Sequence, residues 1–143
     1  EILQFIGDAI LIVFEIKRPE DEAAVCERAL DAAIDAFASI AVVNHRRRRA
    51  GLPEIEFGLG LHLGTVTHAN VGSPNRLAFN VVGPAVNKTA RIQSLTKEAG
   101  VPLLLSNDFA KLVKRRLRSV GEFALRGIAE PQALFTPAEE DPA

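Results

Sequence analysis

The stretch NVVGPAVNKTARI, residues 80–92, decides the fold and the candidate site of this 143-residue chain. The β-branched Val81 and Val82 favour a strand, and Gly83-Pro84 ends it, because proline is well accommodated in the first turn of a helix. The apolar residues that follow recur at helical spacing. The pattern therefore predicts a strand, a tight turn and a helix.

Two polar residues of that helix, Asn87 and Arg91, are four positions apart and so share one face. An amide beside a guanidinium suits an anionic ligand, because arginine offers five hydrogen-bond donors and keeps its charge. A polar pair on a helix face can equally be an ordinary solvated surface. Only motifs elsewhere in the chain can decide between an anion-binding site and a solvated surface.

Composition narrows the class of protein. The length suits one domain with a real core, and the net charge of 17 − 18 = −1 gives no argument for binding nucleic acid or a membrane. No apolar run is long enough to span a bilayer, so we expect membrane attachment only through segments outside these residues. The single cysteine, Cys26, cannot form an internal disulfide, which fits a reducing, cytoplasmic compartment, and its alanine-rich surroundings predict a small buried hydrophobe.

The first third of the chain predicts a hairpin and a long helix. Residues 2–14 are almost wholly apolar, and Gly7-Asp8 interrupts them as a turn signal. Taken alone, Asp8 is a turn residue, because aspartate tolerates turn geometry. Residues 19–49 predict a helix with an acidic start and four closing arginines, 46–49, which either cap the helix dipole in solvent or bind an anionic partner.

Alternating apolar residues predict a strand over residues 54–72, a turn at 73–75 and a return strand at 77–82. Glycine in such a strand indicates close approach of another backbone. We interpret His62 and His68 as structural, because neither has a cluster of Cys or carboxylate residues at metal-ligand spacing. The residues opposite the apolar row of the strand are Gly58, Gly60, His62 and Gly64.

The last third predicts short elements. Gly100 is a plausible helix C-cap, followed by a buried strand at 101–105 and a helix that starts after Ser106 and runs through Val113 or beyond. Residues 119–136 predict a final hairpin that turns at Arg126-Gly127. We assign residues 1–137 to one domain and 138–143 to an acidic tail.

Together these motifs resemble the class III nucleotide cyclases, the adenylate and guanylate cyclase catalytic domains. Each motif is weak alone, but they follow the family's order over nearly the whole chain. The resemblance implies an α+β fold of the ferredoxin-like βαββαβ type, mainly an antiparallel sheet flanked by helices, here lacking the N-terminal strand and helices. The motifs are Phe5-Ile6-Gly7-Asp8; Gly60-Leu61-His62-Leu63-Gly64; Asn70-Val71-Gly72-Ser73 with Arg76 and Phe79; Val82-Gly83, Ala85-Val86-Asn87 and Ala90-Arg91; and Leu125-Arg126-Gly127 with Glu130-Pro131.

The resemblance also implies a reaction. Such enzymes convert a nucleoside triphosphate to the 3′,5′-cyclic monophosphate and pyrophosphate, with two Mg²⁺ or Mn²⁺ ions assisting attack of the 3′-hydroxyl on the α-phosphorus. Arg91 matches the family's transition-state arginine, and Asn87 matches the asparagine that orients the ribose. Asp8, beside the substrate-contacting Gly7, matches a metal-binding aspartate, and Arg126 matches a basic residue on the terminal phosphates. The family's site forms in a head-to-tail dimer, so Asp8 would face the other three residues across the interface of a homodimer.

Two positions depart from the usual pattern of the adenylate cyclases. Gln4 and Asn80 stand where these enzymes often have lysine and aspartate or threonine. Amides both donate and accept hydrogen bonds, so this pair could contact adenine or guanine. We expect relaxed base selection, with ATP favoured and GTP usable.

A further departure concerns the metal. The family's first metal aspartate precedes the Gly7-Asp8 hairpin by a long segment, and no residue of this chain matches it. We therefore expect this polypeptide alone to be poorly active. The alternative to a working cyclase is a cyclase-like domain that serves dimerisation or nucleotide sensing without turnover.

Overall fold

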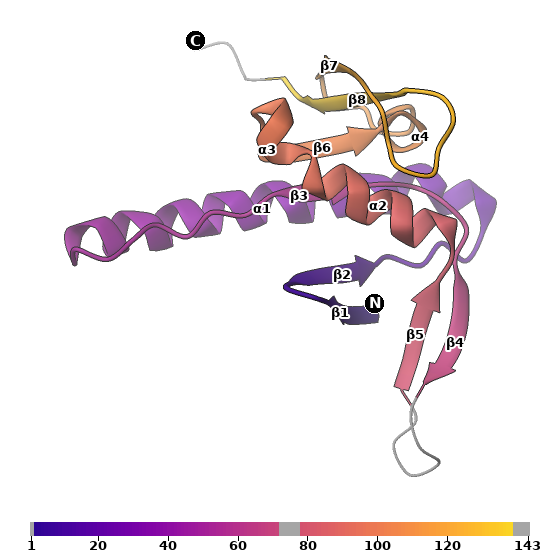
Figure 1. The fold of residues 1–143 in the computed structure, drawn as a ribbon, viewed down its shortest axis with the longest axis horizontal. Coiled ribbons are helices and arrows are strands. Elements are labelled where there is room, and N and C mark those ends of the chain that lie inside the picture. The colour runs from indigo at the N-terminus through magenta and orange to yellow at the C-terminus, as the bar shows by residue number, and fades with distance from the viewer. Residues whose placement is uncertain (1, 72–77, 139–143) are drawn as a thin grey trace.

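A four-stranded sheet with the order β3-β6-β8-β7 is the largest sheet of the computed structural model, which describes residues 2–71 and 78–138 (Figure 1). The pairing of β3 with β6 is parallel, and the other two pairings are antiparallel. Two antiparallel hairpins form separate two-stranded sheets, β1-β2 and β4-β5. The strands are β1 (Ile2–Ile6), β2 (Ala9–Val13), β3 (Leu59–Leu61), β4 (Thr67–Val71), β5 (Ala78–Val82), β6 (Leu103–Ser106), β7 (Leu117–Phe123) and β8 (Gln132–Pro137).

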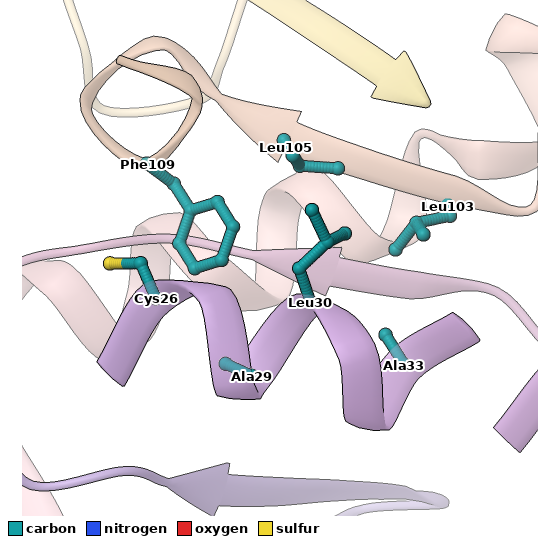
Figure 2. Close-up of a cluster of buried hydrophobic side chains, with 7 residues drawn as sticks. All are labelled: Cys26, Ala29, Leu30, Ala33, Leu103, Leu105 and Phe109. Atoms are coloured by element: carbon teal, nitrogen blue, oxygen red, sulfur yellow. The ribbon is translucent and has the colours of Figure 1, made fainter. Parts of the chain in front are cut away.

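The two longest helices, α1 (Glu22–Arg49) and α2 (Pro84–Ser94), cover the two faces of β6, whose residues are all buried. The shorter helices are η1 (Pro19–Asp21), α3 (Thr96–Ala99) and α4 (Asn107–Ala110). On one face, Leu30 of α1 packs with Leu103 and Leu105 (Figure 2). On the other, Ile92 of α2 packs with Leu104. Because side chains alternate along a strand, α1 and α2 cover opposite faces of the sheet, which confirms the expected α+β class.

The glycines expected to mark a close approach do so, because α2 lies directly on β3. A β-carbon built on Gly60 would lie 2.8 Å from the backbone nitrogen of Gln93. One built on Gly64 would lie 2.6 Å from Cβ of Ala85 at the start of the same helix. The absence of a side chain on Gly60 and Gly64 therefore allows α2 to pack this closely.

Replacing Gly60 with alanine is expected to lower the free energy of unfolding by about 1–3 kcal/mol, because the added methyl group must displace the backbone of α2. Urea denaturation compared with the exposed control Glu56→Ala measures the effect. A Gly60→Ala variant as stable as the control would contradict this packing.

The strand predicted over residues 54–72 is wrong in its extent. Residues 52–58 are irregular, β3 covers only Leu59–Leu61, and β4 begins at Thr67. The Asn44 side chain explains the late start, because its amide binds both the N–H and the C=O of Ile55, at 2.7 and 2.8 Å. Ile55 therefore has no need of a strand partner. The predicted turn at 73–75 lies outside the described residues.

The C-terminal elements also differ from prediction. The helix expected through Val113 or beyond ends at Ala110, and β7 begins at Leu117. The connection from β7 to β8 is longer than an Arg126-Gly127 turn, since it runs from residue 124 to 131. Pro137, the last residue assigned to the domain, ends β8, while residues 139–143 of the expected tail lie outside the described part. Gly100 is a helix C-cap, as predicted: it ends α3 with its backbone in the left-handed region.

The single cysteine of the chain, Cys26, is a buried free thiol. Cys26 is 3% exposed, and burial raises the pKa of its thiol to about 11, which confirms its expected role as a small buried hydrophobe.

Arg47 donates to the carbonyl of Pro53, and Arg48 pairs with Glu54 at 2.6 Å, so the basic end of α1 holds the segment that follows it. None of the helices in residues 2–71 and 78–138 combines the length and the apolar character needed to cross a membrane.

Candidate functional site

The junction of β5 and α2 forms one wall of the candidate site. Gly83 has φ +135° and ψ 172°, a backbone conformation that a residue with a side chain rarely adopts. Its carbonyl accepts the N–H groups of Val86 and Asn87, at 3.1 and 3.3 Å. Pro84 then occupies the first turn, where its missing N–H costs nothing. The positive end of the α2 dipole therefore lies at this junction.

A cavity of about 620 Å³ opens beside this helix N-terminus, a size that suits a nucleotide-sized ligand. Three cationic side chains line it, and no carboxylate does so among the described residues. Cations beside a helix N-terminus favour an anion. The lining residues are His62, Thr65, Thr67, Gly83, Pro84, Ala85, Asn87, Lys88, Arg91, Arg126, Gly127 and Ile128.

Asn87 and Arg91 reach this cavity from the face of α2 that sequence spacing predicts. Ile92, beside Arg91 in sequence, is fully buried against β6 and fixes the rotation of the helix. Arg91 is half-buried and Asn87 is exposed. The two side chains therefore project from an anchored helix rather than from a mobile loop.

Arg126 reaches the same cavity from the connection between β7 and β8, which lies over α2 (Figure 1). Leu125 is 4% exposed and packs in the core with Ile92. The N–H of Ile128 donates to the carbonyl of Leu125 at 3.0 Å, which closes a turn around Arg126 and Gly127. A buried anchor and a backbone turn thus place an exposed guanidinium opposite α2.

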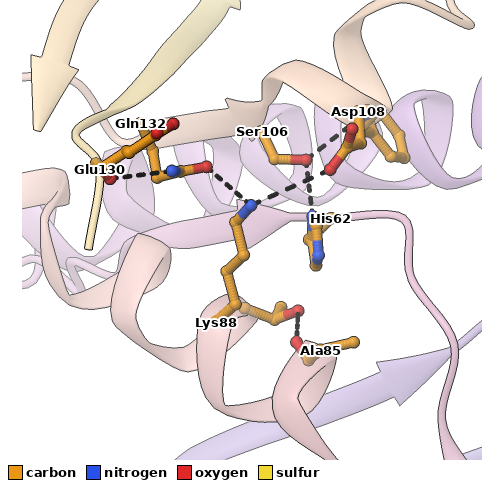
Figure 3. A network of polar contacts seen from close by, with 9 residues as sticks. His62, Ala85, Lys88, Ser106, Asp108, Glu130 and Gln132 are labelled. Carbon is orange, nitrogen blue, oxygen red and sulfur yellow. Dashed lines mark hydrogen bonds and ion pairs between the residues drawn. The ribbon is translucent and has the colours of Figure 1, made fainter. Parts of the chain in front are cut away.

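Lys88 lies in the cavity wall, where its ammonium group contacts residues of β8 and α4 (Figure 3). Its ammonium donates to Oε1 of Gln132 at 2.9 Å and lies 3.9 Å from Oδ2 of Asp108. Within the described residues, no carboxylate pairs with Arg91 or Arg126. The two guanidiniums are therefore the cations best able to bind a ligand, while Lys88 joins α2 to β8 and α4.

His62 lines the cavity wall next to the start of α2. Its Nδ1 lies 2.7 Å from Oγ of Ser106, which also accepts the N–H of Phe109 and so caps α4. Burial, and then the nearby charge of Lys88, lower the pKa of His62 below its usual 6.5, which Asp108 only partly opposes. The imidazole is therefore neutral at pH 7.

This lowered pKa predicts a pH-dependent loss of stability. The unfolded chain takes up a proton on His62 at a higher pH than the folded chain does. The contribution of neutral His62 is thus present above about pH 6.5 and is lost as the pH falls through its lowered pKa. Urea midpoints at pH 7.5 and 5.5 should fall further for the wild type than for His62→Gln; an equal fall in both would contradict the shift.

The remaining predicted site residues lie elsewhere in the chain. Gly7, with φ +58°, and Asp8 form the two-residue turn between β1 and β2, as predicted, and Asp8 is exposed. Gln4 lies in β1, and Asn80 lies in β5 opposite Ala69, with its side chain outside the described part. In Figure 1 the β1-β2 turn is at the end of its hairpin away from the N-terminus of α2. One chain thus brings Asn87, Arg91 and Arg126 together, but not Asp8.

A complete metal centre is not present within residues 2–71 and 78–138, since no three His, Cys, Asp or Glu side chains gather there. Asp8 offers an exposed carboxylate, which is the type of ligand that Mg²⁺ and Mn²⁺ prefer. Mg²⁺ often uses one or two carboxylates and takes its other ligands from substrate phosphates and water. Asp8 therefore fits as one ligand of a site that the substrate would help to complete.

Sequence reasoning missed two groups of the cavity wall. Lys88 directly follows Asn87, but its position between half-buried Gln132 on β8 and exposed Asp108 on α4 is a product of the tertiary fold. His62 was interpreted as structural, and the structure adds that its ring lines the cavity. The sequence signal was its place among Gly60 and Gly64, which let α2 approach.

Comparisons with known proteins agree with this architecture. Residues 1–136 match the family described as the adenylate and guanylate cyclase catalytic domain. An uncharacterised protein of Mycobacterium tuberculosis is 34% identical over 99% of this chain and 24% of its own length. An adenylate cyclase of Anabaena cylindrica is 36% identical over 86% of this chain and 23% of its own length. The chain thus spans about a quarter of the length of these curated relatives.

Solved structures show the same fold. The adenylyl cyclase CyaB from P. aeruginosa superposes with a TM-score of 0.79 at 20% identity, covering 97% of this chain and 71% of that one. The guanylyl cyclase Cya2 superposes with a TM-score of 0.72 at 25% identity, covering 94% of this chain and 68% of that one. The chain therefore belongs to the adenylate and guanylate cyclase catalytic domains, the class III nucleotide cyclases.

Proposed function

We propose that this domain converts a nucleoside triphosphate to its 3′,5′-cyclic monophosphate and pyrophosphate, in the service of cyclic-nucleotide signalling. The observation that carries the proposal is the cavity at the start of α2, which gathers Asn87, Arg91 and Arg126 on an anchored helix and loop. A triphosphate brings several negative charges, and this cavity offers a helix N-terminus and two guanidiniums with which no carboxylate of residues 2–71 and 78–138 pairs. Family membership supplies the reaction class.

Each residue of the cavity has a distinct proposed task. Arg126, exposed on its loop, binds the terminal phosphates. Arg91, half-buried and one helix turn from Asn87, donates to the α-phosphate as charge develops there. Asn87 orients the ribose so that the 3′-hydroxyl is in line with the α-phosphorus. Correct orientation of the attacking group is itself a large part of catalysis in phosphoryl transfer.

The proposed site is completed by a second copy of the chain. Asp8 lies outside the cavity that holds Arg91 and Arg126, so one chain alone separates the metal ligand from the phosphate ligands. The hairpin that carries Asp8 also exposes apolar side chains, with Phe5 at 74%, Ile10 at 57% and Ile12 at 52%. Exposed apolar surface of this kind favours association. A head-to-tail homodimer would bring the Asp8 hairpin of each subunit to the cavity of its partner.

Asp8 would hold Mg²⁺ or Mn²⁺ in this assembly, with two ions at each site. When bound, such ions lower the pKa of the attacking hydroxyl and neutralise charge on the triphosphate. Gln4 and Asn80 would contact the base, and their amides could turn to suit adenine or guanine. We therefore propose that ATP is preferred and that GTP is also used, since comparable folds are named for both adenylyl and guanylyl cyclases.

The direct test is cyclic-nucleotide production by the full-length protein with Mn²⁺ and either ATP or GTP. We expect turnover that rises more steeply than linearly with protein concentration, because the site needs two subunits. Relative kcat/KM values test base selection: a preference for one nucleotide by more than about a hundredfold would contradict the role of the amide pair.

The competing function is a cyclase-like domain that binds nucleotide without turning it over. The exposed, single carboxylate at Asp8 is the observation that favours it, because no metal cluster gathers within the described residues. Saturable binding of ATP with no cyclic product at any protein concentration would support this second function and overturn the first.

A further inference from the structure

His62 is a half-buried imidazole in the cavity wall to which the proposed reaction gives no task. Ser106, its hydrogen-bond partner, is 1% exposed. The Ser106 oxygen already accepts the N–H of Phe109 at 3.2 Å. The hydroxyl hydrogen of Ser106 still needs an acceptor, because a buried donor without one is costly.

Nδ1 of His62 provides that acceptor, since it lies 2.7 Å from Oγ of Ser106. It can accept only if it carries a lone pair and no hydrogen. Burial favours the neutral ring, and a neutral imidazole has one hydrogen shared between two nitrogens. The hydrogen bond from Ser106, which also caps α4, therefore leaves the single ring N–H of neutral His62 on Nε2.

Nε2 lies at the point where the cavity meets α2. A β-carbon built on Gly64 would be 3.2 Å from this nitrogen and 2.6 Å from Cβ of Ala85. Figure 3 shows the ring extending from Ser106 toward the first turn of α2. Gly64 places no side chain beside this nitrogen, and His62 is one of the residues that line the cavity.

We propose that the Nε2–H of His62 donates a hydrogen bond to a phosphate oxygen of the bound triphosphate, and to the pyrophosphate that leaves. The inference rests on the proposed function, because it takes the cavity to be a polyphosphate site. The Nε2–H of neutral His62 supplies a hydrogen-bond donor beside Arg91 and Arg126 but brings no further positive charge. A hydrogen bond to a charged oxygen is stronger than one between neutral groups.

Two substitutions separate this role from a purely structural one. The amide nitrogen of His62→Gln can lie near the position of Nε2. The shorter side chain of His62→Asn reaches only the position of Nδ1, where its amide oxygen can accept from Ser106 but no donor faces the cavity. Calorimetric titration of the full-length protein with pyrophosphate should show His62→Asn weaker than wild type by about tenfold or more. His62→Gln should stay within about threefold, and the control His45→Gln, exposed at the end of α1, should match wild type.

The outcomes are distinct. Equal losses in His62→Asn and His62→Gln, or no loss in either, would overturn the donor role, with thermal melts of each variant confirming that it is folded. If wild type turns over nucleotide while the two variants behave alike, this inference fails and the proposed function stands. If wild type makes no cyclic product but binds pyrophosphate in the predicted order, the proposed function fails and the role of His62 stands.

Discussion

Replacing Arg91 with alanine is expected to lower kcat by about 10²–10³-fold with little change in KM. The guanidinium stabilises charge that develops on the α-phosphate in the transition state, so its loss removes catalysis more than binding. The helix should remain intact, because Ile92 anchors it and alanine is a strong helix former. Steady-state kinetics with Mn²⁺ and ATP measure both constants.

Two controls sharpen the Arg91 experiment. Arg91→Lys keeps a charge but loses the planar pair of donors, so it should recover only part of the rate. Lys97→Ala removes an exposed cation from α3, outside the cavity, and should leave kcat unchanged. A kcat for Arg91→Ala within about threefold of wild type would contradict the role given to this residue.

Replacing Asp8 with asparagine is expected to lower kcat by at least about 10²-fold at saturating Mn²⁺, because an amide is a much poorer ligand than a carboxylate for a hard cation. Binding of pyrophosphate to the cavity in the absence of metal should not change, because Asp8 does not line it. The two-residue turn should persist, since Gly7 supplies its positive φ.

Asp35→Asn, on an exposed face of α1, is the matched control for charge removal and should behave as wild type. Measuring kcat against Mn²⁺ concentration distinguishes weaker metal binding from misfolding. Retention of full metal-dependent turnover by Asp8→Asn would show that Asp8 is no more than the turn residue that its position in the hairpin first suggests.

Local chemistry made several elements predictable. Gly7-Asp8 predicted the hairpin turn because the first turn position has a positive φ, which glycine adopts easily. Gly83-Pro84 predicted the start of α2 because Gly83 can adopt a positive φ and the proline ring holds φ of Pro84 near its helical value. The spacing of Asn87 and Arg91 predicted their shared face. These features depend on residues that are neighbours in sequence or one helix turn apart.

Features that depend on distant partners escaped prediction. The strand over residues 54–72 failed because the Asn44 side chain, from another element, takes the hydrogen bonds of Ile55. The long connection around Arg126 depends on Leu125 entering the core beside Ile92. The orientation of His62 depends on Ser106, 44 residues away. Nothing in the periodicity of the sequence records these contacts.

The most direct test of the account is complementation between two inactive variants. Asp8→Asn and Arg91→Ala, each inactive alone, are mixed as unfolded or dissociated subunits and allowed to reassociate. If the site forms between two chains, half of the random dimers carry one intact site, and the mixture should recover about a quarter of wild-type turnover. If turnover in the mixture stays at the level of the separate variants, Asp8 and Arg91 do not meet across an interface, and the proposed shared site is wrong.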